Sequence, residues 1–217
     1  MSGLTRLHLA PLAAALALTA ACAPAEGPEG TVGPDEVETQ GLPLSAATAT
    51  AASPHGLVVG GVSLDEDRFW EAWLLPSDGT APRRLAPVGN ALVGVTEAGA
   101  VWTDLGDLEA GLPTYETRLS PTDGSAAVPL ADDLPTHFQP ALAVSDGDGW
   151  LLAGTDEVGG APRACVYAAG GGRRARLLAT LPGEPLFLSA LLSPDALTLE
   201  IQQDPEGAAE RVTVPRR

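Results

Sequence analysis

Apolar and polar positions follow a short period along most of the chain. From Leu42 onward, short runs rich in Val, Leu, Ala and Trp are separated by turns rich in Gly, Asp and Pro. Within many of these runs apolar and polar residues alternate, which is typical of half-buried β-strands. No long segment shows the period of about 3.6 residues that an amphipathic helix requires. The pattern therefore predicts an all-β fold for residues 42–217.

The turns between these runs recur in register. One series opens each repeat, at spacings of 43, 49 and 48 residues: Ser53, Thr96, Ser145 and Ser193. A second, acidic series has spacings of 42, 49 and 48 residues: Asp65, Asp107, Asp156 and Asp204. A third has spacings of 45 and 48 residues: Asp78, Asp123 and Gly171. Because the series drift together, the chain contains four copies of one unit.

Each unit has the size and strand content of a propeller blade. The second copy contains four strand-like runs, "ALVGV", "AVWTDL", "TYETRL" and "AAVPL". Four antiparallel strands in about 45 residues is typical of a blade. We therefore predict a small β-propeller-like domain of about four four-stranded blades. A β-sandwich built from the same strands is the alternative.

The last copy ends after "AERVTVP" and has no run for a fourth strand. An unpaired flat edge favours aggregation, so closure of the row of blades into a ring is expected. The segment 36–44 lies just before the first copy and could supply the missing strand. We therefore predict that it clasps the last blade.

Two turn sequences carry a family resemblance. "SPHG" at 53–56 is followed about 25 residues later by "DGTAPRRL" at 78–85, and "SPDA" opens the last copy. This pattern resembles the repeat of the TolB and WD40-like propeller families. The resemblance covers about residues 45–214 and implies a propeller fold. This chain has four copies, whereas those propellers usually have six or more.

The N-terminus has the features of an export signal. Arg6 precedes an apolar stretch that is shorter than the roughly 20 residues needed to span a bilayer. The signal, residues 1–21, ends in "TAAC", which resembles the lipobox of bacterial lipoproteins. That resemblance implies cleavage before Cys22 and lipid, including palmitate, on Cys22. An ordinary secretory signal is the alternative. Residues 22–41 are rich in Pro, Gly and Glu and are predicted to be a flexible tether.

These features predict a location. We expect the protein to be exported and held at the bacterial cell envelope through its lipid. Ala23 follows the lipidated cysteine, and the family's sorting pattern then implies the outer membrane, where the organism has one.

The charge is strongly one-sided. The chain has 28 Asp and Glu against 12 cationic residues, all of them Arg, for a net charge of −16. Nucleic acid is therefore excluded as a probable partner class.

Acidic residues recur between the second and third strands of each copy. These turns are expected to share one face of a propeller, so their carboxylates would form an acidic rim. Such a rim could attract a basic partner or Ca²⁺. The alternative is that Asp simply suits solvated turns. The predicted rim residues are Asp65, Glu66, Asp67, Asp107, Asp156, Glu157 and Asp204.

The sequence shows no catalytic or metal-binding signature. It has no spaced His and Cys cluster, no phosphate-binding Gly loop before a helix and no nucleophile elbow. Cys165 lies in a strand-like run and is predicted to be buried. No catalytic residue, metal site or cofactor is assigned.

The four tryptophans differ in their predicted roles. Trp102 and Trp150 follow equivalent turns and should pack between blades. Trp70 and Trp73 fall on opposite faces of one strand, so one of them could be an exposed platform for a ligand or partner.

The function predicted from sequence is a non-catalytic lipoprotein. Its propeller-like domain would bind or scaffold a protein or glycan partner in the envelope. The alternative is a propeller-type hydrolase or lyase that uses rim carboxylates.

Overall fold

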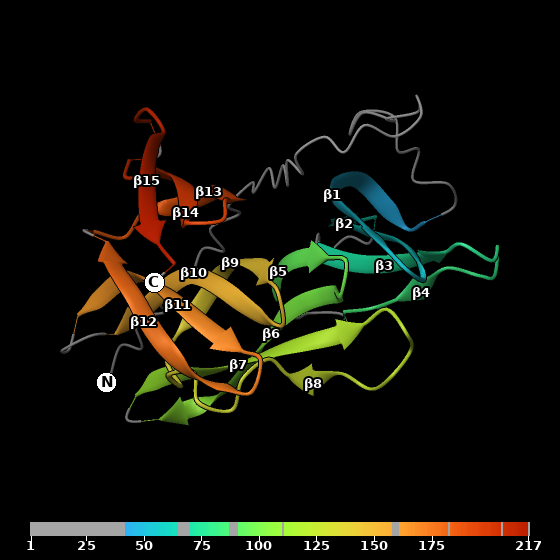
Figure 1. The fold of residues 1–217 in the computed structure, drawn as a ribbon, viewed down its shortest axis with the longest axis horizontal. Coiled ribbons are helices and arrows are strands. Elements are labelled where there is room, and N and C mark those ends of the chain that lie inside the picture. Colours follow the sequence, from blue (N-terminus) through green and yellow to red (C-terminus); the bar gives the residue numbers. More distant parts are fainter. Residues whose placement is uncertain are drawn as a thin grey trace, which may run out of the picture.

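The computed structural model describes residues 42–64, 70–86, 91–109, 111–157, 161–181, 183–204 and 206–216. These residues form fifteen β-strands and no helix (Figure 1). The described part therefore contains no helical segment of the length and apolarity that would cross a membrane. The predicted signal, Cys22 and the tether lie outside the described residues.

The strands form four separate antiparallel sheets in chain order. The first contains β1 (Leu44–Ser53), β2 (Gly56–Ser63), β3 (Trp70–Pro76) and β4 (Arg83–Arg84). The second contains β5 (Ala91–Thr96), β6 (Gly99–Glu109), β7 (Leu112–Pro121) and β8 (Val128–Pro129). The third contains β9 (Gln139–Asp146), β10 (Gly149–Glu157), β11 (Pro162–Gly170) and β12 (Arg173–Leu181). The fourth contains β13 (Leu186–Leu192), β14 (Ala196–Gln202) and β15 (Glu210–Pro215).

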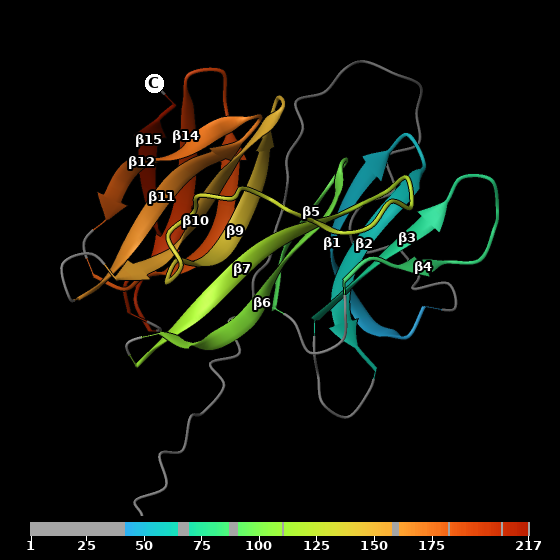
Figure 2. The same ribbon diagram turned by 90° about the horizontal axis from the view of Figure 1, so that it is seen from below.

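The sheets are arranged as the blades of a four-blade propeller. Neighbouring blades contact through their first strands, β1 with β5, β5 with β9, and β9 with β13. Figure 2 shows the blades following one another from the first (blue) to the last (red). The all-β, four-blade prediction is confirmed, and the β-sandwich alternative is wrong. The fourth blade has three strands among the described residues.

Alternation along each strand fills the space between blades. In β10, Leu151 and Ala153 pack toward the fourth blade, whereas Trp150 and Leu152 pack toward the second. In the first blade, Val58 joins the cluster shared with the second blade. As predicted, Trp102 and Trp150 are buried, with exposed fractions of 5% and 8%. Hence each blade is stabilised mainly by its neighbours.

The opening turn of the first blade is fixed by a hydroxyl and a glycine. Ser53 Oγ donates to the carbonyl oxygen of Gly56 at 2.8 Å and accepts from the His55 amide at 3.2 Å. Gly56 has a φ of +143°, and a Cβ there would overlap the carbonyl oxygen of Leu75. A side chain at this position would therefore push apart β2 and β3. Thr96 and Ser193 form the equivalent hydroxyl bonds in the second and fourth blades, whereas Ser145 Oγ in the third blade donates to Glu97 Oε1.

The predicted clasp is not formed by the described part of segment 36–44. Leu44 pairs with Ser63 in the first blade, and the carbonyl oxygen of Pro43 accepts a hydrogen bond from Leu64 at 2.8 Å. Leu42 and Leu44 are buried against Val59. These leucines find an apolar surface on the blade that follows them, so they do not extend to the last blade. Residues 36–41 lie outside the described residues.

Candidate functional site

The predicted acidic rim is only partly described. Asp107, near the end of β6, and Asp204, between β14 and β15, are exposed. Asp204 Oδ1 caps its own turn by accepting from the Glu206 amide at 3.1 Å. Glu157 is half-buried at the end of β10. Asp65, Glu66 and Asp67 lie outside the described residues, so the rim remains a prediction.

Asp156 does not lie on an exposed rim. It is 6% exposed and accepts a hydrogen bond from the Tyr167 hydroxyl at 2.6 Å. β10 continues through this position, and Asp156 pairs with Arg163 of β11. Burial, together with the Asp156 carboxylate, raises the pKa of Tyr167. Asp156 is thus a structural hydrogen-bond acceptor inside the third blade.

Trp73 is engaged by its own blade. Its indole Nε1 donates to Glu71 Oε2 at 2.9 Å, and the Arg84 guanidinium lies 5.0 Å from the ring centroid. The other side of the indole packs on the cluster around Leu42 and Val59. Trp70, at the start of β3, is half-buried. Both residues are half-buried, and an aromatic platform at either of them stays a prediction.

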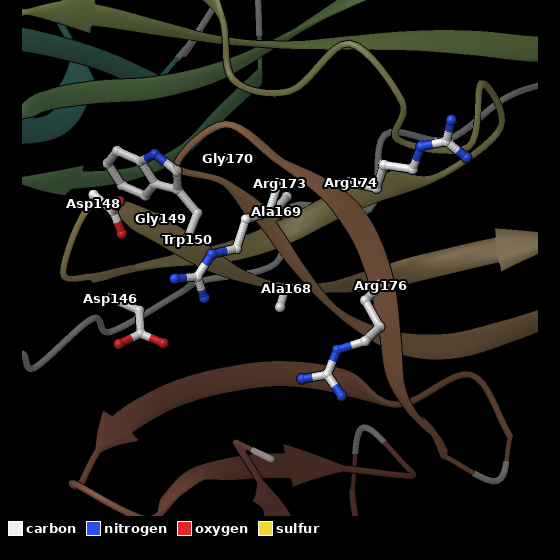
Figure 3. A pocket seen from close by; sticks show the side chains of 10 residues that line it. All are labelled: Asp146, Asp148, Gly149, Trp150, Ala168, Ala169, Gly170, Arg173, Arg174 and Arg176. Carbon is white, nitrogen blue, oxygen red and sulfur yellow. The ribbon is translucent and has the colours of Figure 1, made fainter.

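A pocket of about 290 Å³ is lined by residues of the third blade, on the side where Asp146 pairs with Arg216. β11 contributes Ala168 to Gly170, whose small size leaves the space open. Trp150 forms one wall, Asp146 comes from the end of β9, and Asp148 comes from the turn before β10. Arg173, Arg174 and Arg176 of β12 complete it (Figure 3). We call it the interblade pocket.

A β-bulge places two arginines in the interblade pocket. Residues three apart on a regular strand point to opposite faces. The register between β11 and β12 shifts between the pairs Ala168–Arg176 and Gly170–Arg173, which adds a residue on β12. Figure 3 shows Arg173 extending below Trp150 toward the aspartates and Arg176 extending toward the fourth blade, whereas Arg174 points away.

The C-terminal segment joins the pocket to the fourth blade. Arg216 pairs with Asp146 and donates to the carbonyl oxygens of Ser193 and Pro194 at 2.8 and 2.9 Å. Arg176 Nη2 donates to the carbonyl oxygen of Arg216 at 3.3 Å. Arg216 thus neutralises Asp146 and fixes that edge of the pocket.

The pocket has an excess of positive charge. With Asp146 paired to Arg216, the remaining charged groups that line the pocket are Arg173, Arg174, Arg176 and Asp148. Neither Arg173 nor Arg176 forms an ion pair with any residue that the structure describes. This is notable because the whole chain carries a net charge of −16.

Two further pockets flank this region. One of about 380 Å³ shares Arg173 and Arg174 and includes Asp132 and Asp133, but Asp133 is already bonded to the Ala175 amide at 2.9 Å. Another, of about 440 Å³, surrounds Tyr115, and burial raises the pKa of that phenol. We take the interblade pocket as the candidate site, because arginines and aspartates of the third blade gather there and Arg216, which follows the fourth blade, pairs with one of them, Asp146.

The described residues offer little for catalysis or metal binding. No group of three or more His, Cys, Asp or Glu among them could hold a metal ion. Cys165 is buried, and this burial raises the pKa of its thiol, so the reactive thiolate is disfavoured.

The arginines of the pocket were missed by the sequence interpretation. The signal was present in "GGGRRAR" at 170–176, where three glycines precede three closely spaced arginines in a lysine-free, acidic chain. Their convergence depends on a bulge, which the alternation of residues does not reveal.

Comparison with known proteins finds solved structures of limited similarity. No protein-family model and no curated protein matches the chain. A chain in the crystal structure of a nidogen/laminin complex aligns with 73% of this chain and over 56% of its own length, with 19% sequence identity and a TM-score of 0.41. The crystal structure of TolB from Acinetobacter baumannii aligns with 81% of this chain and over 44% of its own length, with 14% sequence identity and a TM-score of 0.40. The chain spans about half the length of these solved chains. Similarity at this level does not indicate a shared function.

Proposed function

We propose that this protein is an exported lipoprotein whose four-blade domain is a non-catalytic binding module for a protein partner in the bacterial envelope. The interblade pocket is its binding site. The observation that carries this proposal is the convergence of Arg173 and Arg176, neither in an ion pair with a described residue, beside Trp150 in a preformed concave site.

The lining of the pocket favours binding over catalysis. Its described residues provide guanidinium groups, carboxylates and small apolar side chains, with no hydroxyl, thiol or imidazole. Such groups recognise charge and shape, but they lack the pairing of nucleophile and base that acyl transfer needs. The hydrolase or lyase alternative would use rim carboxylates, and one of these, Asp156, is buried in a structural hydrogen bond.

The aromatic residues favour a protein over a glycan as the partner. Sugar rings pack their C–H faces on exposed aromatic rings. Here Trp102 and Trp150 are buried, and the ring of Trp73 is covered by Arg84 and the leucine cluster. Arginine, in contrast, is enriched in protein interfaces because its planar fork binds carboxylates and carbonyls.

The anchor would hold the domain at a distance from the membrane. Lipid on Cys22 provides the attachment, and residues 22–41 would extend over at most about 70 Å. Replacing Cys22 with Ser should move the protein from the membrane fraction to the soluble fraction, or leave the unprocessed precursor. Equal membrane association of the wild type and the variant, with no palmitate label in either, would contradict the anchor.

Site-specific crosslinking tests the binding site. A photo-crosslinking amino acid at position 174, which lines the pocket, should capture a defined envelope protein in intact cells. The substitution Arg173→Glu in the same chain should abolish that product, because it reverses a charge inside the pocket. The same crosslinker at Leu105, an exposed residue on the β6–β7 hairpin, is the control. A product that survives Arg173→Glu would place the partner elsewhere.

A further inference from the structure

The charges in the interblade pocket define which ligand it fits. Besides the Asp146–Arg216 pair, three arginines, Arg173, Arg174 and Arg176, and the Asp148 carboxylate line the pocket. The excess is therefore two positive charges. A negatively charged ligand group would reduce this excess.

The geometry of the arginines also favours a planar anion. Each guanidinium carries donors in a fixed fork that matches the two oxygens of a carboxylate. The bulge in β12 brings both forks to one pocket, and the bond from Arg176 to the Arg216 carbonyl uses only one of its donors. Several donors therefore remain for a ligand.

We propose that the interblade pocket binds a carboxylate group, held between Arg173 and Arg176. The carboxylate comes either from the C-terminus of a protein chain or from a small free acid. The pocket of about 290 Å³ has room for a few atoms beyond the carboxylate, and Ala168 and Trp150 provide an apolar wall for them. This inference names the ligand chemistry of the proposed binding site. It rests on the proposed function only where it takes the carboxylate to belong to a protein partner.

Protection from arginine modification tests the proposal directly. The full-length protein in detergent is treated with phenylglyoxal, which modifies accessible guanidinium groups, and each arginine is followed by peptide mass spectrometry. Succinate should protect Arg173 and Arg176 in a saturable manner, and its neutral analogue succinamide should not. Arg163, which is exposed at the opposite end of β11, serves as the internal reference.

Matched variants identify the residues responsible. Arg173→Gln should raise the succinate concentration for half-protection of Arg176 about tenfold, because one charged hydrogen-bonding group is lost. Arg163→Gln changes the net charge equally and should leave half-protection unchanged. Arg173 has no hydrogen bond or ion pair with the described residues, and unchanged melting of the variant would verify its fold.

The source of the carboxylate is read from a second pair of probes. An acetylated dipeptide with a free C-terminus is compared with its C-terminal amide. Tighter protection by the acid peptide than by succinate identifies a chain terminus, and equal protection identifies a small free acid. The proposal would be overturned if the peptide amide protected the arginines as well as the acid peptide, or if succinamide protected them as well as succinate. It would also be overturned if succinate protected Arg163 as well as it protects Arg173 and Arg176. Succinate could protect Arg173 and Arg176 in the purified protein while the crosslinked product survives Arg173→Glu. That result would contradict the pocket as the partner-binding site and leave the carboxylate proposal in place.

Discussion

The two end blades differ in the face that they turn away from the row. In the first blade this face carries Val59, Trp73 and Leu75, and two leucines pack on it: Leu42, which precedes β1, and Leu44, its first residue. In the last blade the corresponding face is largely polar: Ser189, Thr198, Glu200, Arg211 and Thr213. The inward face of the same blade is apolar, with Leu197, Leu199 and Ile201 buried.

The difference shows two ways to end a stack of repeats. A terminal repeat needs an outer face that tolerates water or is covered. The first blade covers its apolar face with residues of its own chain, whereas the last blade has polar side chains there. The carboxylates on the two faces differ in the same way, in burial and in their partners. Glu71 is 1% exposed and pairs with Arg84, but Glu200 is half-buried and accepts only from Ser189 at 2.9 Å.

Removal of the leucine cover should have the largest effect. Leu44 is 2% exposed, so Leu44→Ala should lower the free energy of unfolding by about 3 kcal/mol through lost burial and a cavity. Leu191, on the outward face of the last blade, is 48% exposed, and Leu191→Ala should change it by less than about 0.5 kcal/mol. Urea denaturation measures both. Equal losses would show that the two end faces are not different.

The buried ion pair of the first blade gives the next effect. Arg84 Nη2 lies 3.0 Å from Glu71 Oε1, and without Arg84 the buried carboxylate would keep only the bond from Trp73. Arg84→Ala should lower the free energy of unfolding by about 2 kcal/mol, below the value for a fully buried pair because Arg84 is one-third exposed. Arg211→Ala, on the last blade, should have no measurable effect.

A second substitution sharpens this test. In the Arg84→Ala background, Glu71→Gln should recover part of the lost stability, since a neutral amide costs less to bury than an unpaired carboxylate. No recovery would show that Arg84 acts through its packing on Trp73.

The repeat architecture could be predicted from the sequence because its signals are local. Turn residues such as Ser53 and Gly56 are required by hydrogen bonds and backbone geometry within a few positions. The equivalent positions of Trp102 and Trp150 after their opening turns predicted the burial of both residues correctly. The fourfold pattern followed from these two signals.

The site could not be predicted because its determinants are not local. Asp156 was assigned to a turn by its spacing, but β10 extends past it and places it opposite a buried tyrosine hydroxyl on the next strand. Arg173 and Arg176 converge only because of a bulge. Segment 36–44 was expected to reach the last blade, but Leu42 and Leu44, which belong to its described part, pack on the apolar face of the first blade.

The smallest expected effect concerns a turn that the first two blades have and the last blade lacks. In the turn before β4, Asp78 accepts hydrogen bonds from the Thr80 amide at 2.9 Å and from its hydroxyl at 2.7 Å. Asp123 accepts the same two bonds from Ser125. These bonds lower the pKa of both carboxyls below the ordinary value of 3.8.

The sign of the pH dependence follows from that direction. The folded state prefers the ionised carboxylates, so their contribution to stability is present above pH 4 or so and is lost as pH falls through the lowered pKa values. The double variant Asp78→Asn with Asp123→Asn no longer titrates there, and its melting temperature should fall less between about pH 5 and pH 3. The control is Asp195→Asn in the last blade, where the carboxylate accepts no hydrogen bond from the described residues. Both carboxylates are exposed, so water competes for their bonds and the effect is small. Identical acid profiles for the double variant and the wild type would contradict the role of these turns.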